Sequence, residues 1–160
     1  MIVRPKSAPA HNMLGTAYQA MGQPALAATE FRTALRLDPV SLDADYNLGN
    51  ALLAQNQPAD AVACFQRVLR ANPNDAAALS DLGSSYAMLG QYDQAVASFE
   101  RSILLHPANA LAHYNLGLIA VRRGRFAEAK AHFERSLAVD PSSQDARRAL
   151  DELNTGLGRK

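Results

Sequence analysis

The sequence predicts an all-α protein, an α-solenoid in which similar pairs of helices stack along one axis. Three observations predict this fold. Five residue types recur every 34 residues in four copies, each copy holds two stretches with helical periodicity, and polar helix-start residues recur with the same period. A unit of this length cannot bury its own apolar face, so neighbouring copies must stack and share a continuous core.

The period is carried by glycine, leucine, alanine, phenylalanine and proline. The series are Gly15/Gly49/Gly83/Gly117, Leu14/Leu48/Leu82/Leu116, Ala27/Ala61/Ala95/Ala129, Phe31/Phe65/Phe99/Phe133 and Pro39/Pro73/Pro107/Pro141. A glycine inside a helix costs about 0.5–1 kcal/mol relative to alanine, so it is expected only where a neighbouring helix comes too close for a side chain. The phenylalanines are then expected to fill the space between paired helices.

Capping residues predict the helix boundaries. Each first helix is expected to begin after a side chain that can accept a hydrogen bond from the free amides of the first turn, namely Ser7, Ser41, Asp75, Asn109 or Ser143. Each pair is expected to turn at a residue that tolerates the left-handed conformation, namely Gly22, Asn56, Gly90 or Gly124. The fifth cap predicts a fifth first helix that has no second helix.

These boundaries divide the chain into an N-terminal extension (1–7), a single domain (8–154) and a C-terminal tail (155–160). The domain holds four helix-turn-helix repeats, 8–41, 42–75, 76–109 and 110–143, and a capping helix, 144–154. The capping helix has Asp151 where the other first helices have glycine, and Arg148 and Glu152 make its outer face polar. We expect it to close the stack and to face solvent.

The four copies share a motif, which in the first copy reads Leu14-Gly15-x-x-Tyr18, Ala27-x-x-x-Phe31 and Pro39, although Leu52 and Ala120 replace the tyrosine in the second and fourth copies. This motif resembles the tetratricopeptide repeat (TPR) over residues 8–154. The resemblance implies a right-handed superhelix whose first helices line a concave groove, and a groove that holds an extended or helical segment of a partner. The chain departs from the family pattern three residues before the Leu-Gly pair, where the usual aromatic residue is replaced by His11, Asp45, Leu79 and His113.

The residues expected to line the groove follow from helix geometry. Residues three or four apart share a helix face, so we take Asn47 as facing the groove and select its neighbours on that face. The candidate peptide-binding residues are Asp43, Tyr46, Asn47 and Asn50 in the second repeat, Ser80, Asp81 and Ser84 in the third, and Tyr114, Asn115, Leu118 and Arg122 in the fourth. This lining is mostly neutral.

The groove chemistry separates two classes of partner. TPR proteins that hold the C-terminal carboxylate of chaperones use groove lysines, and the corresponding positions here are Asn12, Tyr46, Ser80 and Tyr114. A carboxylate clamp is therefore not expected. Asn47, Asp81 and Asn115 instead resemble the asparagine ladder of O-linked N-acetylglucosamine transferases, in which an amide pairs with a peptide bond whatever the side chain. Asn-Leu-Gly is also common in these repeats as plain solvated surface, and the sequence leaves both interpretations open.

Composition and charge narrow the function further. With 48% hydrophobic and 19% charged residues, the chain has the composition of an ordinary globular domain. Its net charge of +1 argues against nucleic acid as a partner. The sequence has no signal core and no apolar run long enough for membrane insertion, so we expect a cytoplasmic protein. The single cysteine, Cys64, excludes a disulfide within the chain.

The charge is unevenly distributed along the chain. Residues 42–109 hold three arginines and seven acids, a net charge of −4, whereas residues 110–160 hold nine basic residues and six acids, a net charge of +3. The cluster Arg122-Arg123-Gly124-Arg125 has the chemistry to contact a phosphate or an acidic peptide, although such clusters are more often solvated helix ends.

No catalytic, cofactor or metal site is expected. The four histidines, His11, His106, His113 and His132, do not share the close sequence spacing of metal ligands and are expected to be structural. The sequence has no glycine-rich phosphate loop, nucleophile elbow or CxxC motif. We therefore expect a protein that is not an enzyme and uses no cofactor.

Three functional hypotheses remain. The first is a non-catalytic scaffold for protein–protein interaction that binds a peptide or helix of a partner in the concave groove. The second is a self-assembling element, a homo-oligomer formed through the N-terminal end of the solenoid, where no repeat precedes the first helix. The third is a regulatory arm of a larger enzyme, such as a glycosyltransferase, whose chemistry lies outside these residues.

Overall fold

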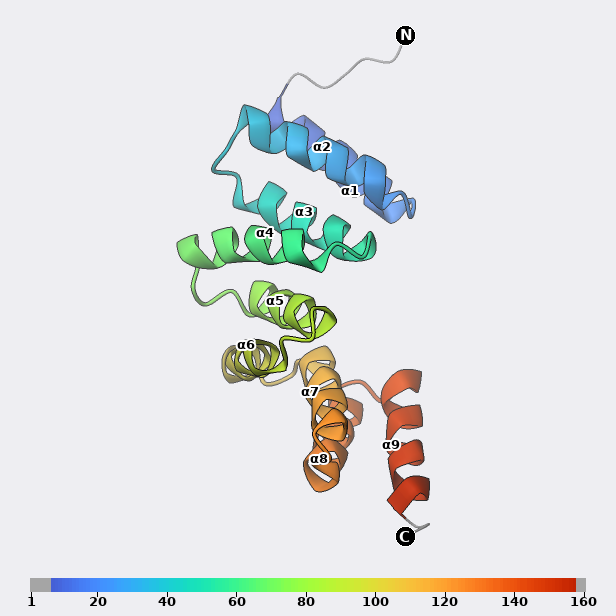
Figure 1. Ribbon diagram of the computed structural model, residues 1–160. Helices are drawn as coiled ribbons and strands as arrows, with labels where there is room; N and C mark the ends of the chain where they lie inside the picture. Colours follow the sequence, from blue (N-terminus) through green and yellow to red (C-terminus); the bar gives the residue numbers. More distant parts are fainter. Residues whose placement is uncertain (1–6, 158–160) are drawn as a thin grey trace.

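A computed structural model of the chain describes residues 7–157. These residues form helices and turns without a strand, arranged as a stack of helix pairs from the N-terminus to the C-terminus (Figure 1). The helices are α1 (Ala8–Ala20), α2 (Pro24–Leu37), α3 (Leu42–Ala54), α4 (Pro58–Ala71), α5 (Ala76–Met88), α6 (Tyr92–Leu105), α7 (Ala110–Arg122), α8 (Phe126–Val139) and α9 (Gln144–Leu157). The predicted α-solenoid is confirmed.

The first helices begin where the capping residues predict. The five cap side chains each accept a hydrogen bond from the backbone N–H three residues later, over 2.9 Å at Asn109 and 3.4 Å at Ser7 and Ser41. The second helices have no such side-chain cap. They follow a left-handed residue instead, with φ between 57° at Asn56 and 74° at Gly90. Both predicted kinds of boundary are confirmed.

The centre of each repeat is a phenylalanine ring packed against a glycine. Phe31, Phe65, Phe99 and Phe133 are all fully buried. A Cβ atom added at Gly83 would lie 2.8 Å from the ring of Phe99, and the other three repeats show the same close approach. The crowding expected at the glycines is therefore present, and its source is the phenylalanine of the second helix.

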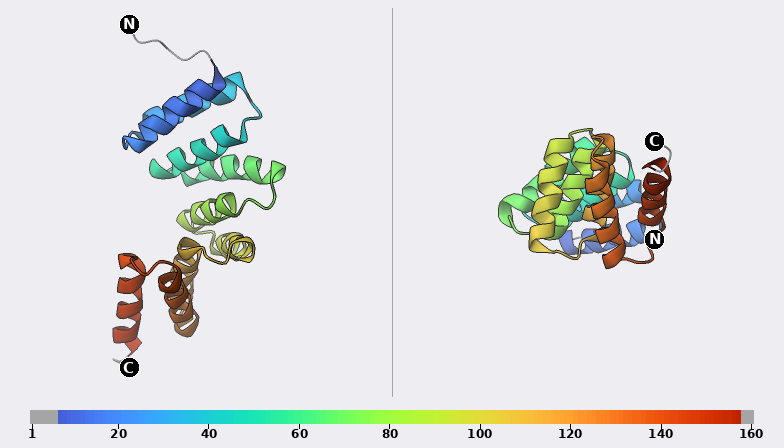
Figure 2. Two further views of the ribbon diagram at one scale, coloured as in Figure 1. Left: turned by 180° about the vertical axis from the view of Figure 1, so that it is seen from behind. Right: turned by 90° about the horizontal axis from the view of Figure 1, so that it is seen from below.

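The last helix is longer than expected. We predicted that it would end at Asn154, with a tail from residue 155, but α9 continues to Leu157. It packs beside α8 at the end of the stack (Figures 1 and 2), where Ala146 and Leu153 are buried and Arg148, Asp151 and Glu152 are exposed. The N-terminal extension lies outside the described residues, except for Ser7.

We expect Gly83→Ala to lower the free energy of unfolding by about 1–3 kcal/mol, because the new methyl group has to displace the Phe99 ring. Gly156→Ala is the matched control, since a Cβ atom there meets nothing within 4 Å. Helix propensity alone acts at that position and raises stability by up to about 1 kcal/mol. Urea unfolding followed by circular dichroism measures both. Equal effects of the two substitutions would contradict the Gly83–Phe99 contact.

Candidate functional site

The first helices α1, α3, α5 and α7 lie next to one another along the stack. We define the first-helix face as the face that carries Asn12, Asn47, Asp81 and Asn115 on these four helices. The candidate binding residues lie on these helices. Two of them, Tyr46 and Tyr114, are positioned by packing against the buried phenylalanine of their own repeat. Tyr46 lies edge-on to Phe65 with ring centroids 5.9 Å apart, and Tyr114 lies 6.0 Å from Phe133.

Side chains of the first-helix face join successive repeats. The amide of Asn47 donates to the Asn12 oxygen over 3.0 Å, and the Tyr46 hydroxyl donates to the Asp81 carboxylate over 2.8 Å. Both pairs are separated by 35 residues, one more than the repeat. Asn47 and Asp81 therefore link neighbouring first helices, a role that the sequence analysis missed although this spacing would have revealed it.

The next pair with the same 35-residue spacing, Ser80 and Asn115, is not joined in this way. The Asn115 amide instead donates to the carbonyl of Leu111 in its own helix, over 3.0 Å. Ser80 is only 5% exposed, and its hydroxyl is the one buried side-chain polar atom without a hydrogen-bond partner among the described residues. The expectation that Ser80 lines an accessible surface is wrong, because α5 and its neighbours cover it.

The other candidate residues reach the surface. Asp43, Leu118 and Arg122 are exposed, and the half-buried ones are Tyr46, Asn47, Asn50, Asp81, Ser84, Tyr114 and Asn115. A cavity of about 330 Å³ opens beside Asp43 and Tyr46, between α3, α4 and the beginning of α5. Whether a peptide binds to these residues stays a prediction.

Burial shifts the pKa values of Tyr46 and Asp81, which are joined by a hydrogen bond. Burial raises the pKa of the Asp81 carboxyl above its ordinary value, and the nearby Asp75 carboxylate acts in the same direction, whereas the hydrogen bond from Tyr46 opposes the shift. Burial and the Asp81 charge raise the pKa of Tyr46 to about 12. The tyrosine therefore keeps its proton at neutral pH and remains the donor.

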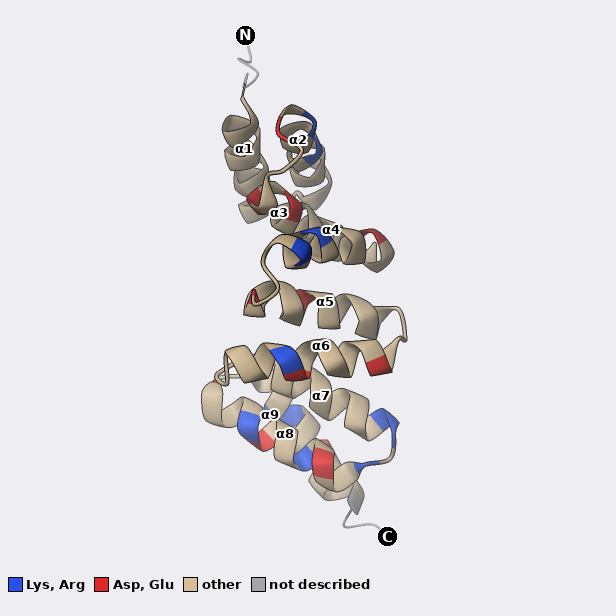
Figure 3. Cartoon of the chain, turned by 90° about the vertical axis from the view of Figure 1, so that its left-hand side faces the viewer, with Lys and Arg blue, Asp and Glu red and all other residues tan. Residues whose placement is uncertain are grey.

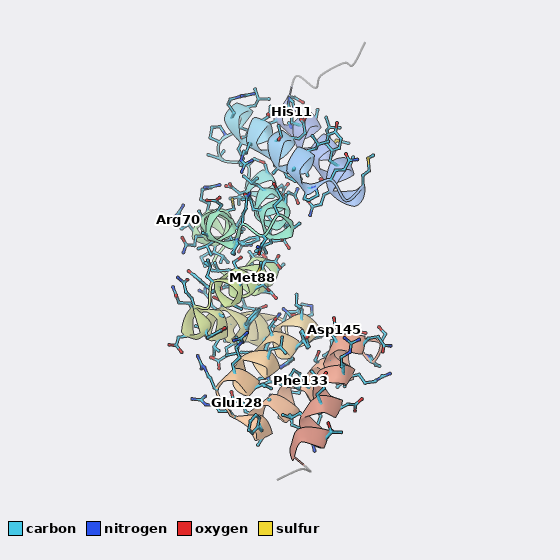
Figure 4. The ribbon with its side chains drawn as sticks, turned by 45° about the vertical axis from the view of Figure 1, so that its right-hand side comes forward. His11, Arg70, Met88, Glu128, Phe133 and Asp145 are labelled. Carbon is cyan, nitrogen blue, oxygen red and sulfur yellow. The ribbon has the colours of Figure 1, made fainter. Side chains whose placement is uncertain are left out.

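An apolar cavity of about 320 Å³ lies between α7, α8 and α9. Its lining residues are Leu118, Val121, Phe126, Phe133, Ala149, Glu152, Leu153 and Gly156. Figure 4 labels Phe133 in the helix pair next to α9, and Asp145 near the beginning of α9. Of these residues, the sequence analysis selected only Leu118 as a candidate binding residue. The small residues Ala149 and Gly156 on the last helix were the sequence signal for an open space here.

The basic cluster lies at the turn between α7 and α8 (Figure 3). Val121 and Phe126, which flank it in the sequence, line this cavity. Arg123 pairs with Asp93 over 2.5 Å, and Arg125 with Glu128 over 3.6 Å. The guanidinium of Arg122 lies over the ring of Tyr92, 5.5 Å from its centre. Two of the three arginines therefore have a carboxylate partner, and Arg122 stacks on an aromatic ring.

The histidines differ in part from expectation. His11 contacts Glu30 inside its own repeat over 2.6 Å, consistent with a structural role. The Nδ1 atoms of His113 and His132, however, lie 3.3 Å apart, so these two histidines do meet. Burial lowers the pKa of both imidazoles. Within residues 7–157 no group of three or more possible metal ligands comes together.

None of the helices that the structure describes is long and apolar enough to span a membrane.

Comparison with known proteins identifies the repeat. The sequence profile described as tetratricopeptide repeat matches residues 12–76, 46–103 and 80–146. No curated protein sequence matches the chain.

Solved structures share this fold over most of the chain. MamA is 22% identical, with a TM-score of 0.79 over 98% of this chain and 87% of its own. PilF of Pseudomonas aeruginosa is 24% identical, with a TM-score of 0.83 over 95% of this chain and 69% of its own. YrrB, described as a TPR protein with an unusual peptide-binding site, is 27% identical, with a TM-score of 0.79 over 89% and 73%.

We expect Asp81→Asn to remove a pH-dependent loss of stability. Because the pKa of Asp81 is raised in the folded state, its contribution is fully present below the ordinary pKa of about 4 and is lost as the pH rises through the raised value. Asparagine still accepts the Tyr46 hydrogen bond but does not ionise. The stability advantage of the variant over the parent should therefore grow as the pH rises from about 4 toward 7.

Urea unfolding at several pH values measures this difference. Tyr46→Phe is the matched comparison, because it removes the hydrogen bond that opposes the shift and should steepen the loss. Parallel stability curves for the parent and Asp81→Asn would show that the carboxyl is not perturbed.

Proposed function

The chain belongs to the tetratricopeptide repeat family, and from this we propose that it is a non-catalytic scaffold that binds a peptide or helix of a partner protein along the first-helix face. Repeats of this family form scaffolds for protein–protein interaction, because stacking creates a long concave surface. Our proposal assigns this role to the groove formed by α1, α3, α5 and α7.

One observation carries the proposal: a row of half-buried polar side chains continues from repeat to repeat along the first-helix face. Asn50, Ser84 and Asn115 provide amide and hydroxyl groups that can pair with the main chain of an extended segment. Ser84 and Asn115 each donate one hydrogen bond to a carbonyl of their own helix and keep an oxygen that can accept another. Asn47 and Asp81, already bonded within the protein, hold the helices that present this row. The description of YrrB as peptide-binding and the net charge of +1, which favours protein over nucleic acid, also support the proposal.

We expect Ser84→Arg to abolish or strongly weaken partner binding, since a long cation in the middle of the first-helix face obstructs a segment lying along it. Ala63→Arg on α4 is the matched control, because Ala63 is exposed on a second helix, away from that face. Affinity capture from a lysate of the source cells, read by mass spectrometry, compares both variants with the parent. Capture of the same partners by parent and Ser84→Arg would rule out the first-helix face as the binding site.

A second candidate, self-assembly through the N-terminal end, is favoured by the outer face of α1. Ala17 is exposed there, whereas its equivalents Ala51, Ser85 and Ile119 are at most 3% exposed, covered by the preceding repeat. Helix α1 contains no Asp, Glu, Lys or Arg, so none of these side chains opposes the approach of two copies of it. This uncovered face is a possible contact between two chains.

If the chain self-assembles in this way, Ala17→Arg should convert the oligomer to monomer, because two arginines would face each other across the contact. Since Ala17 is already exposed, its substitution should leave the fold and the unfolding temperature nearly unchanged. Light scattering coupled to size exclusion, with Ala63→Arg as control, gives the mass of each variant. A parent that is monomeric at high concentration, or an oligomer that Ala17→Arg leaves intact, would eliminate this candidate.

A further inference from the structure

The fourth repeat differs from the others at one position of the first-helix face. Leu118 is 38% exposed, and the equivalent residues of the earlier repeats are polar, namely Thr16, Asn50 and Ser84. More than a third of this leucine's surface stays in contact with water, and that part contributes nothing to the burial of apolar surface on folding. Its position on the binding face of the proposed scaffold points to a role in recognition.

Leu118 forms one wall of the apolar cavity between α7, α8 and α9. Val121 and Phe126 are also partly exposed there, and the buried ring of Phe133 contributes to the lining. At about 320 Å³, the cavity is at the lower end of the range of roughly 300–1,000 Å³ that is typical of ligand sites. It is large enough to take a bulky apolar side chain from a partner.

Two of the four residues by which the last helix lines this cavity are small. Ala149 and Gly156 both line the cavity, and a Cβ atom built at Gly156 would meet no atom within 4 Å. The equivalent of Gly156 in the fourth repeat is Arg122, and in the third it is Met88. The space is therefore a consequence of residue choice on α9.

The positive charge of Arg122 indicates which kind of partner residue lies next to the apolar side chain that enters the cavity. Arg122 is one turn after Leu118 and shares its helix face. Among the described residues it is the member of the basic cluster with no carboxylate partner, because Asp93 and Glu128 pair with Arg123 and Arg125. Its contact with the Tyr92 ring places the guanidinium next to the beginning of α6. A carboxylate near it would add to the stacking interaction.

We propose that the cavity between α7, α8 and α9 binds one bulky apolar side chain of the partner segment, and that a neighbouring Asp or Glu of that segment pairs with Arg122. The partner is thus an acidic segment with a leucine, isoleucine, methionine or phenylalanine anchor. This inference rests on the proposed function, and adds to it a position and a chemistry. Apolar anchors that fill a desolvated cavity dominate many protein interfaces, and a rim charge adds selectivity.

The test uses short random peptides displayed on phage and selected on the full chain. The expected result is enrichment of peptides with a bulky apolar residue next to Asp or Glu. Gly156→Phe should weaken binding of the enriched peptides by at least about tenfold, because the new ring fills the cavity. Gly156→Ala is the matched control and should bind nearly as the parent does.

Two further variants make the test independent of α9. Leu118→Asn introduces the residue that the second repeat has at Asn50, and should weaken the same peptides. Arg122→Gln should weaken peptides that carry the acidic residue more than versions with Asn or Gln in its place, and high salt should reduce this difference.

The outcomes separate the inference from the proposed function. Peptides that lose binding to Ser84→Arg but bind Gly156→Phe and Leu118→Asn as tightly as the parent would overturn the cavity inference and leave the scaffold in place. Enrichment of basic segments, or of segments without an apolar residue, would also overturn it. Peptides that are indifferent to Ser84→Arg and to the cavity variants alike would overturn both.

Discussion

The structure depends on the contact between a phenylalanine of each second helix and a glycine of the first helix. Because the ring occupies the volume in which a Cβ atom would lie, the glycine lets the two helices of a repeat approach closely and the ring limits how closely. The same contact recurs every 34 residues, so every repeat presents its outer faces in nearly the same way to the next repeat. The regular row of side chains along the first helices is a consequence of this one internal contact.

Hydrogen bonds along the row fix how neighbouring repeats are set relative to each other. Asn12–Asn47 and Tyr46–Asp81 connect the first three first helices, whereas the side-chain series stops between α5 and α7. The fourth repeat also differs in having an apolar residue, Leu118, on the first-helix face and a cavity beside it. At the position of Leu118 the first-helix face is thus polar in the first three repeats and apolar in the fourth, where Arg122 adds a positive charge one turn later.

The sequence predicted those structural features that are set by a single residue type recurring at the same position of each repeat. The caps, the left-handed turn residues, the crowding at the glycines, the burial of the phenylalanines and the pairing of helices each depend on one residue type at a fixed place, and all were confirmed. The burial of Ser80, the meeting of His113 with His132 and the cavity beside α9 were not predicted. Each of these depends on the summed volume of several side chains on different helices, which a single repeated position does not determine.

The polar outer face of α9 restricts the symmetry available to any assembly of this chain. In each interior step, a first helix lies on the second helix of the repeat before it, and α9 occupies that place on α8. All four second helices are therefore already covered within one molecule, and none is left to receive α1 of another copy. Head-to-tail addition that repeats the internal stacking therefore has no free second helix to use, whereas two copies that meet α1 against α1 form a closed dimer with two-fold symmetry.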